Sequence, residues 1–338
     1  VSQYRKGLFK RFELPEPYRV IRRGDTREYS LRMQNQPHVN SWYAASASMG
    51  TQFPPLQGEE TADVCVIGGG YTGLSTAIFL RKRGYSVILL EANKVGWGAS
   101  GRNGGHVGTG QRAEQEQLEK MVGLDQARAL WQLGLEAVDT VCQLIAENNI
   151  ECELKQGNLH VASKAKEAPG LQAEVEHLSS IYGYDQIRYV DKEELGEMTS
   201  GQGFHAGTLD SGARHLHPLK YAYGLADAAA RAGAIIHEGS RVQSYSEGEQ
   251  VSVKTDSGEV RARFVVLACN GYLEKLEPRT AGRIMPINNY MLATEPLSEE
   301  MARRLIRDDT SMSDSLFVIN YWKLSADNRL LFGGGESY

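Results

Sequence analysis

ADVCVIGGGYTG, residues 62–73, is the stretch that decides the fold. An apolar run of strand length ends abruptly at three glycines, and the apolar positions after them recur at helical spacing as far as Arg83. Gly84 follows as a helix-ending residue, and Ser86–Leu90 is again β-branched and apolar. Strand, helix and strand therefore follow within about 30 residues, which predicts a βαβ unit with parallel strands.

The glycines of this stretch predict a dinucleotide site. Gly68, Gly70 and Gly73 fit the pattern GxGxxG, in which the first glycine allows the tight turn, the second admits a pyrophosphate and the third lets helix and strand pack closely. Glu91 ends the next strand, 18 residues after Gly73, where a carboxylate accepts hydrogen bonds from ribose hydroxyls and repels a 2′-phosphate. The unit fits FAD or NAD rather than NADP, and it does not choose between the first two.

Composition limits the remaining possibilities. A chain of 338 residues exceeds what one core usually organises, so two interleaved domains are expected. The net charge of −5 gives no general attraction to nucleic acid, and no apolar run approaches the roughly 20 residues of a membrane span. The four cysteines include no CxxC pair, no metal site is predicted, and without a signal-peptide stretch a cytoplasmic location is expected.

The first 32 residues differ from the rest, with nine Arg or Lys against four acidic residues and no clear periodicity. We interpret residues 1–40 as a flexible basic extension. A basic arm, an organellar presequence and translated sequence upstream of a natural start at Met33 are the alternatives, and the last is favoured because domain character begins only after Met33.

Further helices and strands are expected along the chain. Helices are predicted over 125–148, over 166–182, from Pro218 to Arg231 and over 298–305. Strands are predicted at residues 157–162, 234–237, 241–245, 250–255, 260–267, 290–294, 316–319 and 329–332.

The loop Gly96–Gly105, GWGASGRNGG, has five glycines in ten residues, together with Ser100, Arg102 and Asn103. Such a loop offers backbone donors and a cation to a phosphate-bearing ligand. Here the sequence begins to resemble the D-amino-acid oxidase-like family of FAD-dependent amine oxidoreductases, in which a GASGRNGG-type loop follows the strand that ends in Glu. The resemblance implies FAD as the cofactor.

Other stretches extend the resemblance from about Ser41 to the last residue: SWYAASAS at 41–48, HLHPLKYA at 215–222, RFVVLACNG at 263–271, TEPLSEE at 294–300 and SADNRLLFGGG at 325–335. It implies a Rossmann-type α/β FAD-binding domain, residues 41–112 and 206–271, interleaved with an α+β substrate domain, residues 113–205 and 272–338. It also implies that a C-terminal segment, which returns to the flavin domain in the family, is missing after Tyr338. The implied FAD-binding residues are Gly68, Gly70, Tyr71, Thr72, Gly73, Glu91, Ala92, Ser100, Arg102, Asn103, Gly104, Gly105, Val242, Ala268 and Gly271.

The resemblance implies oxidation of a primary amine of a polyamine derivative, such as gamma-glutamylputrescine, to aldehyde and ammonia. Oxygen, giving H2O2, or a quinone would reoxidise the flavin. Tyr321 and Trp322 are candidate aromatic walls of the substrate pocket, and His217 either contacts substrate or makes a structural hydrogen bond. His106 is expected to make a non-covalent polar contact with flavin, and Lys323 lies either near the reduced flavin or on the surface.

Two alternatives remain open. A secondary amine or an amino acid, such as sarcosine, glycine or a D-amino acid, carries a carboxylate that needs a well-placed arginine, for which Arg279 and Arg283 are candidates. The other alternative is a flavin-binding protein without turnover.

Overall fold

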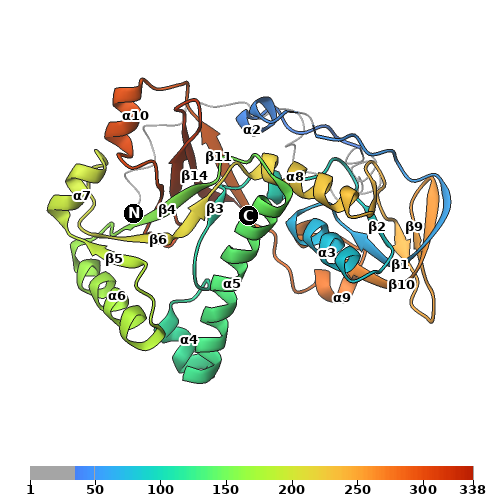
Figure 1. Cartoon of the computed structure of the whole chain (residues 1–338), viewed down its shortest axis with the longest axis horizontal. Helices are drawn as coiled ribbons and strands as arrows, with labels where there is room; N and C mark the ends of the chain where they lie inside the picture. Colours follow the sequence, from blue (N-terminus) through green and yellow to red (C-terminus); the bar gives the residue numbers. More distant parts are fainter. Residues whose placement is uncertain (1–34, 49, 338) are drawn as a thin grey trace.

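The computed structural model describes residues 35–48 and 50–337, and these form two lobes, each built on one β-sheet. Figure 1 shows the lobes side by side, with helices α5 (Leu124–Asn148) and α8 (Pro218–Arg231) where they meet. Most of the predicted extension 1–40, including Met33, lies outside the described residues. Its described end is held in place, because Asn35 N donates to Ala92 O (3.0 Å) and Trp97 Nε1 donates to Pro37 O (3.0 Å).

The six-stranded sheet contains the predicted βαβ unit. Its order is β7-β2-β1-β10-β9-β8, and β7, β2, β1 and β10 run parallel while β9 is antiparallel to β10. Helix α3 (Tyr71–Lys82) joins β1 to β2, which confirms the predicted strand, helix and strand. The strands are β1 Gly58–Ile67, β2 Val87–Leu90, β7 Ile235–His237, β8 Ser244–Tyr245, β9 Val251–Lys254 and β10 Gly258–Leu267.

The eight-stranded sheet forms the other lobe, in the order β11-β14-β13-β12-β4-β6-β3, with β5 also paired to β6. Its pairs are antiparallel except β12 with β4, so the mixed α/β fold class is confirmed. Strands β3 and β6 lie here, although the predicted boundaries at 112 and 206 assign their residues to the FAD-binding domain. The strands are β3 His106–Val107, β4 Lys155–Val161, β5 Ile187–Val190, β6 Gly207–His215, β11 Asn288–Ala293, β12 Ser311–Asp314, β13 Tyr321–Leu324 and β14 Leu330–Ser337.

The five helices predicted from the sequence are all present, with ends within two residues of those expected, and four further α-helices in residues 35–48 and 50–337 were not predicted. Pro218 begins α8 and Arg231 ends it, as predicted, because proline lacks the N–H that the first turn leaves unpaired. The other α-helices are α2 Trp42–Ser46, α4 Gln115–Val122, α6 Ala168–Tyr182, α7 Lys192–Met198, α9 Pro278–Ala281 and α10 Glu299–Leu305. Short 3₁₀ turns are η2 Ala99–Gly101, η3 Ala165–Glu167 and η4 Asn270–Tyr272.

One strand prediction is wrong and another is confirmed only in part. Residues 316–319 form no strand, because the Asp314 carboxylate accepts the N–H groups of Leu316 (3.2 Å) and Asn320 (2.9 Å) and so closes a turn between β12 and β13. The predicted strand over 241–245 shrinks to β8, which leaves Val242 in a loop.

Each lobe has its own apolar core. The core of the six-stranded lobe packs α3 and α8 against the sheet and includes Val64, Val66, Leu74, Ile78 and Leu225. The core of the eight-stranded lobe packs α7 and α10 against one face of its sheet and includes Leu159, Val161, Leu195, Ile306 and Met312. A rigid sheet edge is therefore available in each lobe to position a site.

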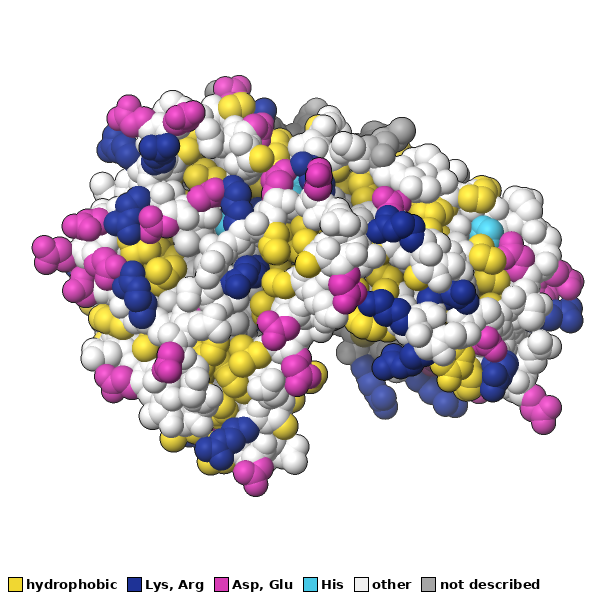
Figure 2. Space-filling model, in the orientation of Figure 1, with side chains coloured by type: hydrophobic (Ala, Val, Ile, Leu, Met, Phe, Trp, Pro, Cys, Tyr) yellow, Lys and Arg dark blue, Asp and Glu magenta, His cyan; other side chains and the backbone are white. Residues whose placement is uncertain are grey.

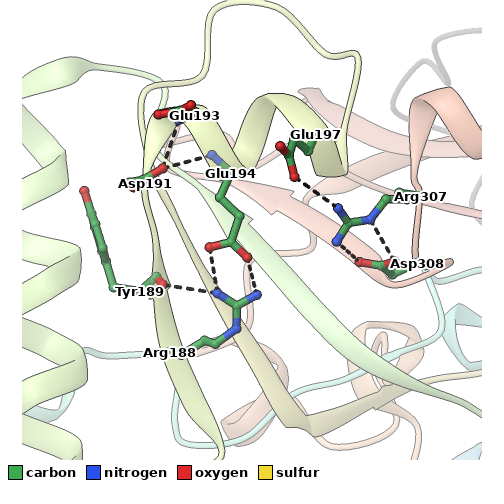
Figure 3. Close-up of polar contacts among 8 residues, drawn as sticks. All are labelled: Arg188, Tyr189, Asp191, Glu193, Glu194, Glu197, Arg307 and Asp308. Carbon is green, nitrogen blue, oxygen red and sulfur yellow. Dashed lines mark hydrogen bonds and ion pairs between the residues drawn. The ribbon is translucent and has the colours of Figure 1, made fainter.

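The surface is polar and mixed in charge. On the face that Figure 2 shows, acidic and basic side chains are interspersed over the eight-stranded lobe, whereas several basic side chains gather on the lower part of the other lobe. Figure 3 shows a cluster beside β5 and α7, in which Arg188 pairs with both oxygens of Glu194 (2.6 and 2.9 Å) and Arg307 pairs with Asp308 (2.8 Å) and Glu197 (3.8 Å). In residues 35–48 and 50–337, no helix combines the length and the apolar character needed to cross a bilayer.

Candidate functional site

The turn after β1 has no room for side chains at two of its glycines. A Cβ on Gly68 would lie 2.5 Å from the carbonyl oxygen of Ala268, and one on Gly73 would lie 1.9 Å from the carbonyl oxygen of Gly68. Gly68 also has φ of +115°, which side chains rarely allow. Gly70 is the N-cap of α3 and has no side chain of its own to cap the helix, so the first-turn N–H groups other than that of Tyr71, which donates to Ser100 Oγ, are available to a ligand.

Glu91 joins this turn to the end of β2. Its Oε2 accepts from Gly69 N (2.6 Å) and its Oε1 accepts from Asn93 N (2.9 Å). Burial raises the pKa of the Glu91 carboxyl, while the N–H groups of Asn93 and Gly69 act in the opposite direction. Each oxygen keeps a lone pair after these bonds, so the carboxylate can also accept from a hydroxyl.

A cavity of about 710 Å³ opens beside this turn, at the carboxyl ends of β1, β2 and β10. Its size suits a cofactor, and the carboxyl edge of a parallel sheet is where such folds bind ligands. Seven of the predicted FAD-binding residues line it: Gly68, Gly70, Glu91, Ala92, Ser100, Val242 and Ala268.

The loop Gly96–Gly105 closes one side of the cavity and is held by its own side chains. Ser100 Oγ accepts from Tyr71 N (3.1 Å), and Asn103 Oδ1 accepts from Gly105 N (2.7 Å). The Arg102 guanidinium lies over the Trp97 ring, with 4.3 Å between Cζ and the ring centre. The loop is therefore built into the fold rather than being a solvent loop.

Eight predicted FAD-binding residues do not line this cavity. Thr72 is exposed on α3, the Tyr71 hydroxyl donates to Pro218 O (3.0 Å), and the nearest neighbours of Gly271 belong to Pro286. Their assignments stay predictions, as do those of Gly73, Arg102, Asn103, Gly104 and Gly105.

Several cavity residues were not predicted from the sequence. Trp97 lies inside the quoted glycine-rich loop and Tyr272 directly follows the quoted turn at Gly271, so both had a local signal. No local pattern marked Asn93, Ser240, Arg241 or Leu273–Leu276 as cavity residues. Residues 273–276 reach the cavity because the irregular backbone around η4, where Asn270 has φ of +49°, brings them back over it.

The end of the same loop meets one face of the eight-stranded sheet, which we call the inner face and define by Tyr321 and Lys323. A Cβ on Gly104 would lie 2.6 Å from the Tyr321 ring, so this ring rests on the loop. His106 lies edge-on to Tyr321, with 5.6 Å between ring centres. Burial lowers the pKa of His106 to about 4, with Lys323 acting in the same direction, so its imidazole is neutral at pH 7.

Lys323 is buried behind Gly105, which excludes the surface position left open by the sequence. Its Nζ donates to Leu216 O (2.5 Å), and a Cβ on Gly105 would lie 2.0 Å from that same oxygen. Burial lowers the pKa of Lys323 to about 8, against the opposing effect of Glu153. The cation therefore stands next to the glycine loop.

His217 makes structural hydrogen bonds, one of the two alternatives that the sequence left open. Its Nδ1 accepts from Lys220 N (3.2 Å) and so caps α8, which leaves Nε2 to donate to Ser46 Oγ (3.0 Å). The rings of Trp42 and Tyr43 pack against it, at 5.1 and 5.0 Å between centres. Both ring nitrogens are engaged in these bonds, which supports the structural alternative, and a substrate contact by His217 stays a prediction.

Trp322 does not share a face with Tyr321, because successive strand residues point to opposite faces of a sheet. Tyr321 lies on the inner face, whereas Trp322 lies on the other and stacks between Phe204 and Phe332, at 5.9 Å from each. The two aromatic residues cannot line one pocket.

The residues present fit FAD. Glycines stand where a Cβ would block the turn, the start of α3 faces the cavity, and a carboxylate suited to ribose hydroxyls lies in its wall. The glycine loop then leads from this cavity to the inner face, so one extended cofactor can contact both.

Comparisons with known proteins agree with this reading. Residues 63–338 match the DAO family model, described as FAD dependent oxidoreductase. The chain is 38% identical over 302 residues to gamma-glutamylputrescine oxidoreductase of Escherichia coli (strain K12), covering 89% of this chain and 71% of that protein. It is 39% identical over 299 residues to the probable oxidoreductase OrdL of Rhizobium meliloti (strain 1021), covering 88% and 69%.

Solved structures share the fold. Glycine oxidase from Geobacillus kaustophilus superposes with a TM-score of 0.63 at 23% identity, covering 82% of this chain and 72% of that one. L-Amino acid deaminase from Proteus myxofaciens gives a TM-score of 0.65 at 20% identity, covering 84% and 61%.

Proposed function

Because the chain belongs to the DAO family of FAD-dependent oxidoreductases, we propose that it oxidises the primary amine of a polyamine derivative such as gamma-glutamylputrescine. The observation that carries the choice of substrate is the 38% identity, over 89% of the chain, to gamma-glutamylputrescine oxidoreductase. The products would be an aldehyde and ammonia, with H2O2 when oxygen reoxidises the cofactor.

The two arginines named for an amino-acid substrate lie away from the inner face, although Lys323 supplies a cation there. A substrate carboxylate beside the reacting carbon needs a cation in the pocket. Arg279 and Arg283, the candidates from the sequence, are exposed, and Arg279 lies on α9 where its charge acts on Glu277 and on Tyr245 of the six-stranded sheet. The arginines therefore lend no support to an amino-acid substrate, and the anaerobic titration decides between the two substrate classes.

The cavity residues have separable tasks in this proposal. Gly68, Gly70 and the start of α3 would hold the diphosphate of FAD, and Glu91 would accept from its ribose. Bound FAD supplies the acceptor for the hydride equivalent that leaves the carbon next to nitrogen.

On the inner face, the chain orients the amine and keeps it dry. The Tyr321 ring would form an aromatic wall beside Gly104, which positions the reacting carbon. The neutral His106 imidazole adds no positive charge to repel an amine that arrives protonated, and the amine must lose that proton before its carbon can be oxidised. Hydrolysis of the imine after oxidation then completes the reaction.

An anaerobic titration of the FAD-loaded protein tests this function. Gamma-glutamylputrescine, sarcosine, glycine and D-alanine are added separately while the visible flavin absorption is followed. We expect gamma-glutamylputrescine to bleach the flavin fastest. Preference for sarcosine or an amino acid would overturn the proposed substrate, and a yellow protein that no amine bleaches would favour flavin binding without turnover.

A further inference from the structure

The two faces of the eight-stranded sheet differ sharply in chemistry. Alternation along each strand sends successive side chains to opposite faces. The face covered by α7 and α10 is apolar, with Leu159, Val161, Met312, Trp322 and Leu324. The inner face is polar at the alternate positions of the same strands, with Asn158, His160, Ser311, Ser313, Tyr321 and Lys323.

A row of these polar side chains begins at Tyr321. Strand register places Tyr321 opposite Ser313, Ser313 opposite His160, and His160 opposite Thr208. Because neighbouring strands lie roughly 4.8 Å apart, the backbone at His160 lies roughly 10 Å from that at Tyr321. The row therefore leads from the wall of the proposed pocket across the inner face.

His160 is the titratable side chain of this row that lies two strands away from Tyr321. Its Nδ1 lies 3.0 Å from Ser313 Oγ, and the side chain is half-buried. In the described part of the chain, no group hydrogen bonds to its Nε2. If Nδ1 donates to the serine, Nε2 carries a lone pair and can accept a hydrogen bond.

The surroundings of His160 favour a donor or a cation. Burial lowers its pKa, so the imidazole is neutral at pH 7. The charged groups that act on it, Asp314, Glu167 and Glu114, are all acids. A substrate group placed there meets an acceptor and negative potential, which suits an ammonium group.

We propose that His160, oriented by Ser313, binds the far end of an extended amine by accepting a hydrogen bond at Nε2. This inference rests on the proposed function. In gamma-glutamylputrescine, about nine bonds separate the reacting carbon from the nitrogen of the far ammonium group, and an extended chain advances roughly 3.5 Å per three bonds, which gives roughly 10 Å. This reach matches the span of the row, whereas glycine or sarcosine would leave His160 without a partner.

The test compares two amines with the same reacting end. Gamma-glutamylputrescine carries an ammonium and a carboxylate on its distal carbon, and N-glutarylputrescine keeps the chain, the amide and the carboxylate but lacks that ammonium. His160→Phe keeps a ring of similar size and removes the acceptor, so we expect kcat/KM for gamma-glutamylputrescine to fall roughly 10- to 100-fold, as for the loss of one hydrogen bond to a charged group. For N-glutarylputrescine, which has no distal ammonium group, the change should stay below about twofold.

Two further variants guard against a general defect. His160→Gln offers a replacement acceptor and should recover part of the loss. His177→Phe is the matched control. His177 on α6 pairs with Glu119 on α4 (2.7 Å), away from the row, so this variant should leave kcat/KM for both amines unchanged. Flavin content and circular dichroism report whether each variant is folded.

The outcomes separate this inference from the proposed function. If His160→Phe lowers kcat/KM equally for both amines, or for neither, while the wild type still oxidises gamma-glutamylputrescine, the role of His160 is overturned and the function stands. If the wild type oxidises no amine, the proposed function is wrong. The imidazole NMR signal of His160 then tests separately whether His160 binds the amine. A shift on adding gamma-glutamylputrescine supports the site, and an unchanged signal overturns it.

Discussion

The cofactor cavity and the inner face of the eight-stranded sheet are built in opposite ways. The cavity is shaped mostly by backbone and small residues, and much of it comes from one continuous segment between Gly68 and Ser100. The inner face is shaped by side chains from strands as far apart in sequence as β3 and β13. The cofactor cavity therefore depends on glycines at fixed positions in the sequence, whereas the inner face depends on the register of the strands.

The largest expected effect comes from adding one methyl group to the cavity. Gly73→Ala would bring Cβ within 1.9 Å of the Gly68 carbonyl oxygen, so the turn and α3 must separate. We expect a loss of FAD binding by at least about 100-fold and a fall in stability of several kcal/mol. Isothermal titration with FAD and denaturant unfolding measure the two effects.

Gly170→Ala is the matched control, because an added Cβ on this exposed glycine of α6 meets nothing within 4 Å. It should bind FAD normally and gain up to about 1 kcal/mol of stability. Normal FAD binding by Gly73→Ala would contradict the claim that the cavity requires glycine at this position.

Adjacent residues on β13 test the other half of the comparison. Trp322→Ala should lower the free energy of unfolding by about 3 kcal/mol, because it removes a half-buried ring from between two others, and leave kcat within about twofold. Tyr321→Leu should do the reverse, lowering kcat/KM about 10-fold or more with less than about 1 kcal/mol of destabilisation. Similar catalytic losses in both variants would contradict the assignment of the two residues to opposite faces.

The neutral histidines near the inner face predict an acid sensitivity. Burial lowers the pKa of His217 to about 4, against the effect of Glu153 and together with the effects of Lys220 and Lys323. A depressed folded pKa contributes stability that is present above the unfolded value near 6.5 and is lost as the pH falls toward 4. Protonation of His217 should therefore lower the free energy of unfolding by roughly 2 kcal/mol between pH 7 and pH 5.

His217→Asn keeps a helix-capping side chain and removes the titration. The drop in unfolding free energy between pH 7 and pH 5, measured with urea, should be smaller in this variant by roughly that amount. An identical drop in both proteins would show that His217 is not held neutral.

The smallest effect is expected at the surface cluster of Figure 3. Arg188→Ala removes the two-pronged contact with Glu194, but both side chains are largely solvated, at 49% and 37% exposure. We expect under about 1 kcal/mol of destabilisation, less at high salt, with FAD binding and kcat unchanged. A larger effect, measured by urea unfolding, would mean that the cluster holds α7 in place.

This contrast explains what the sequence could predict. The glycine turn, Glu91 and the helices α3, α5 and α8 follow from local patterns, because their spacing directly reflects backbone geometry. Strand β6 (GTLDSGARH) carries Gly, Asp and Ser, which disfavour strands, and it is held instead by pairing with β4 and β5.

Pairings between distant residues had no local signal. His106 lies opposite His215 only because β3 joins β6, and the face of Trp322 is set by the short hairpin that follows Asp314. The apolar residues 316–319 suggested a strand, but a single carboxylate that accepts two N–H groups decides otherwise. Side-chain sites that depend on register are therefore the least accessible from sequence.

Trp97, stacked under Arg102 in the cavity wall, also gives the molecule an optical property. Of the four tryptophans, it is the one that lines the cavity. The emission of the Trp97 indole overlaps the absorption of an isoalloxazine. FAD binding should therefore quench the intrinsic fluorescence, and FAD release should restore it. Loading could thus be followed in real time without a dye or a label.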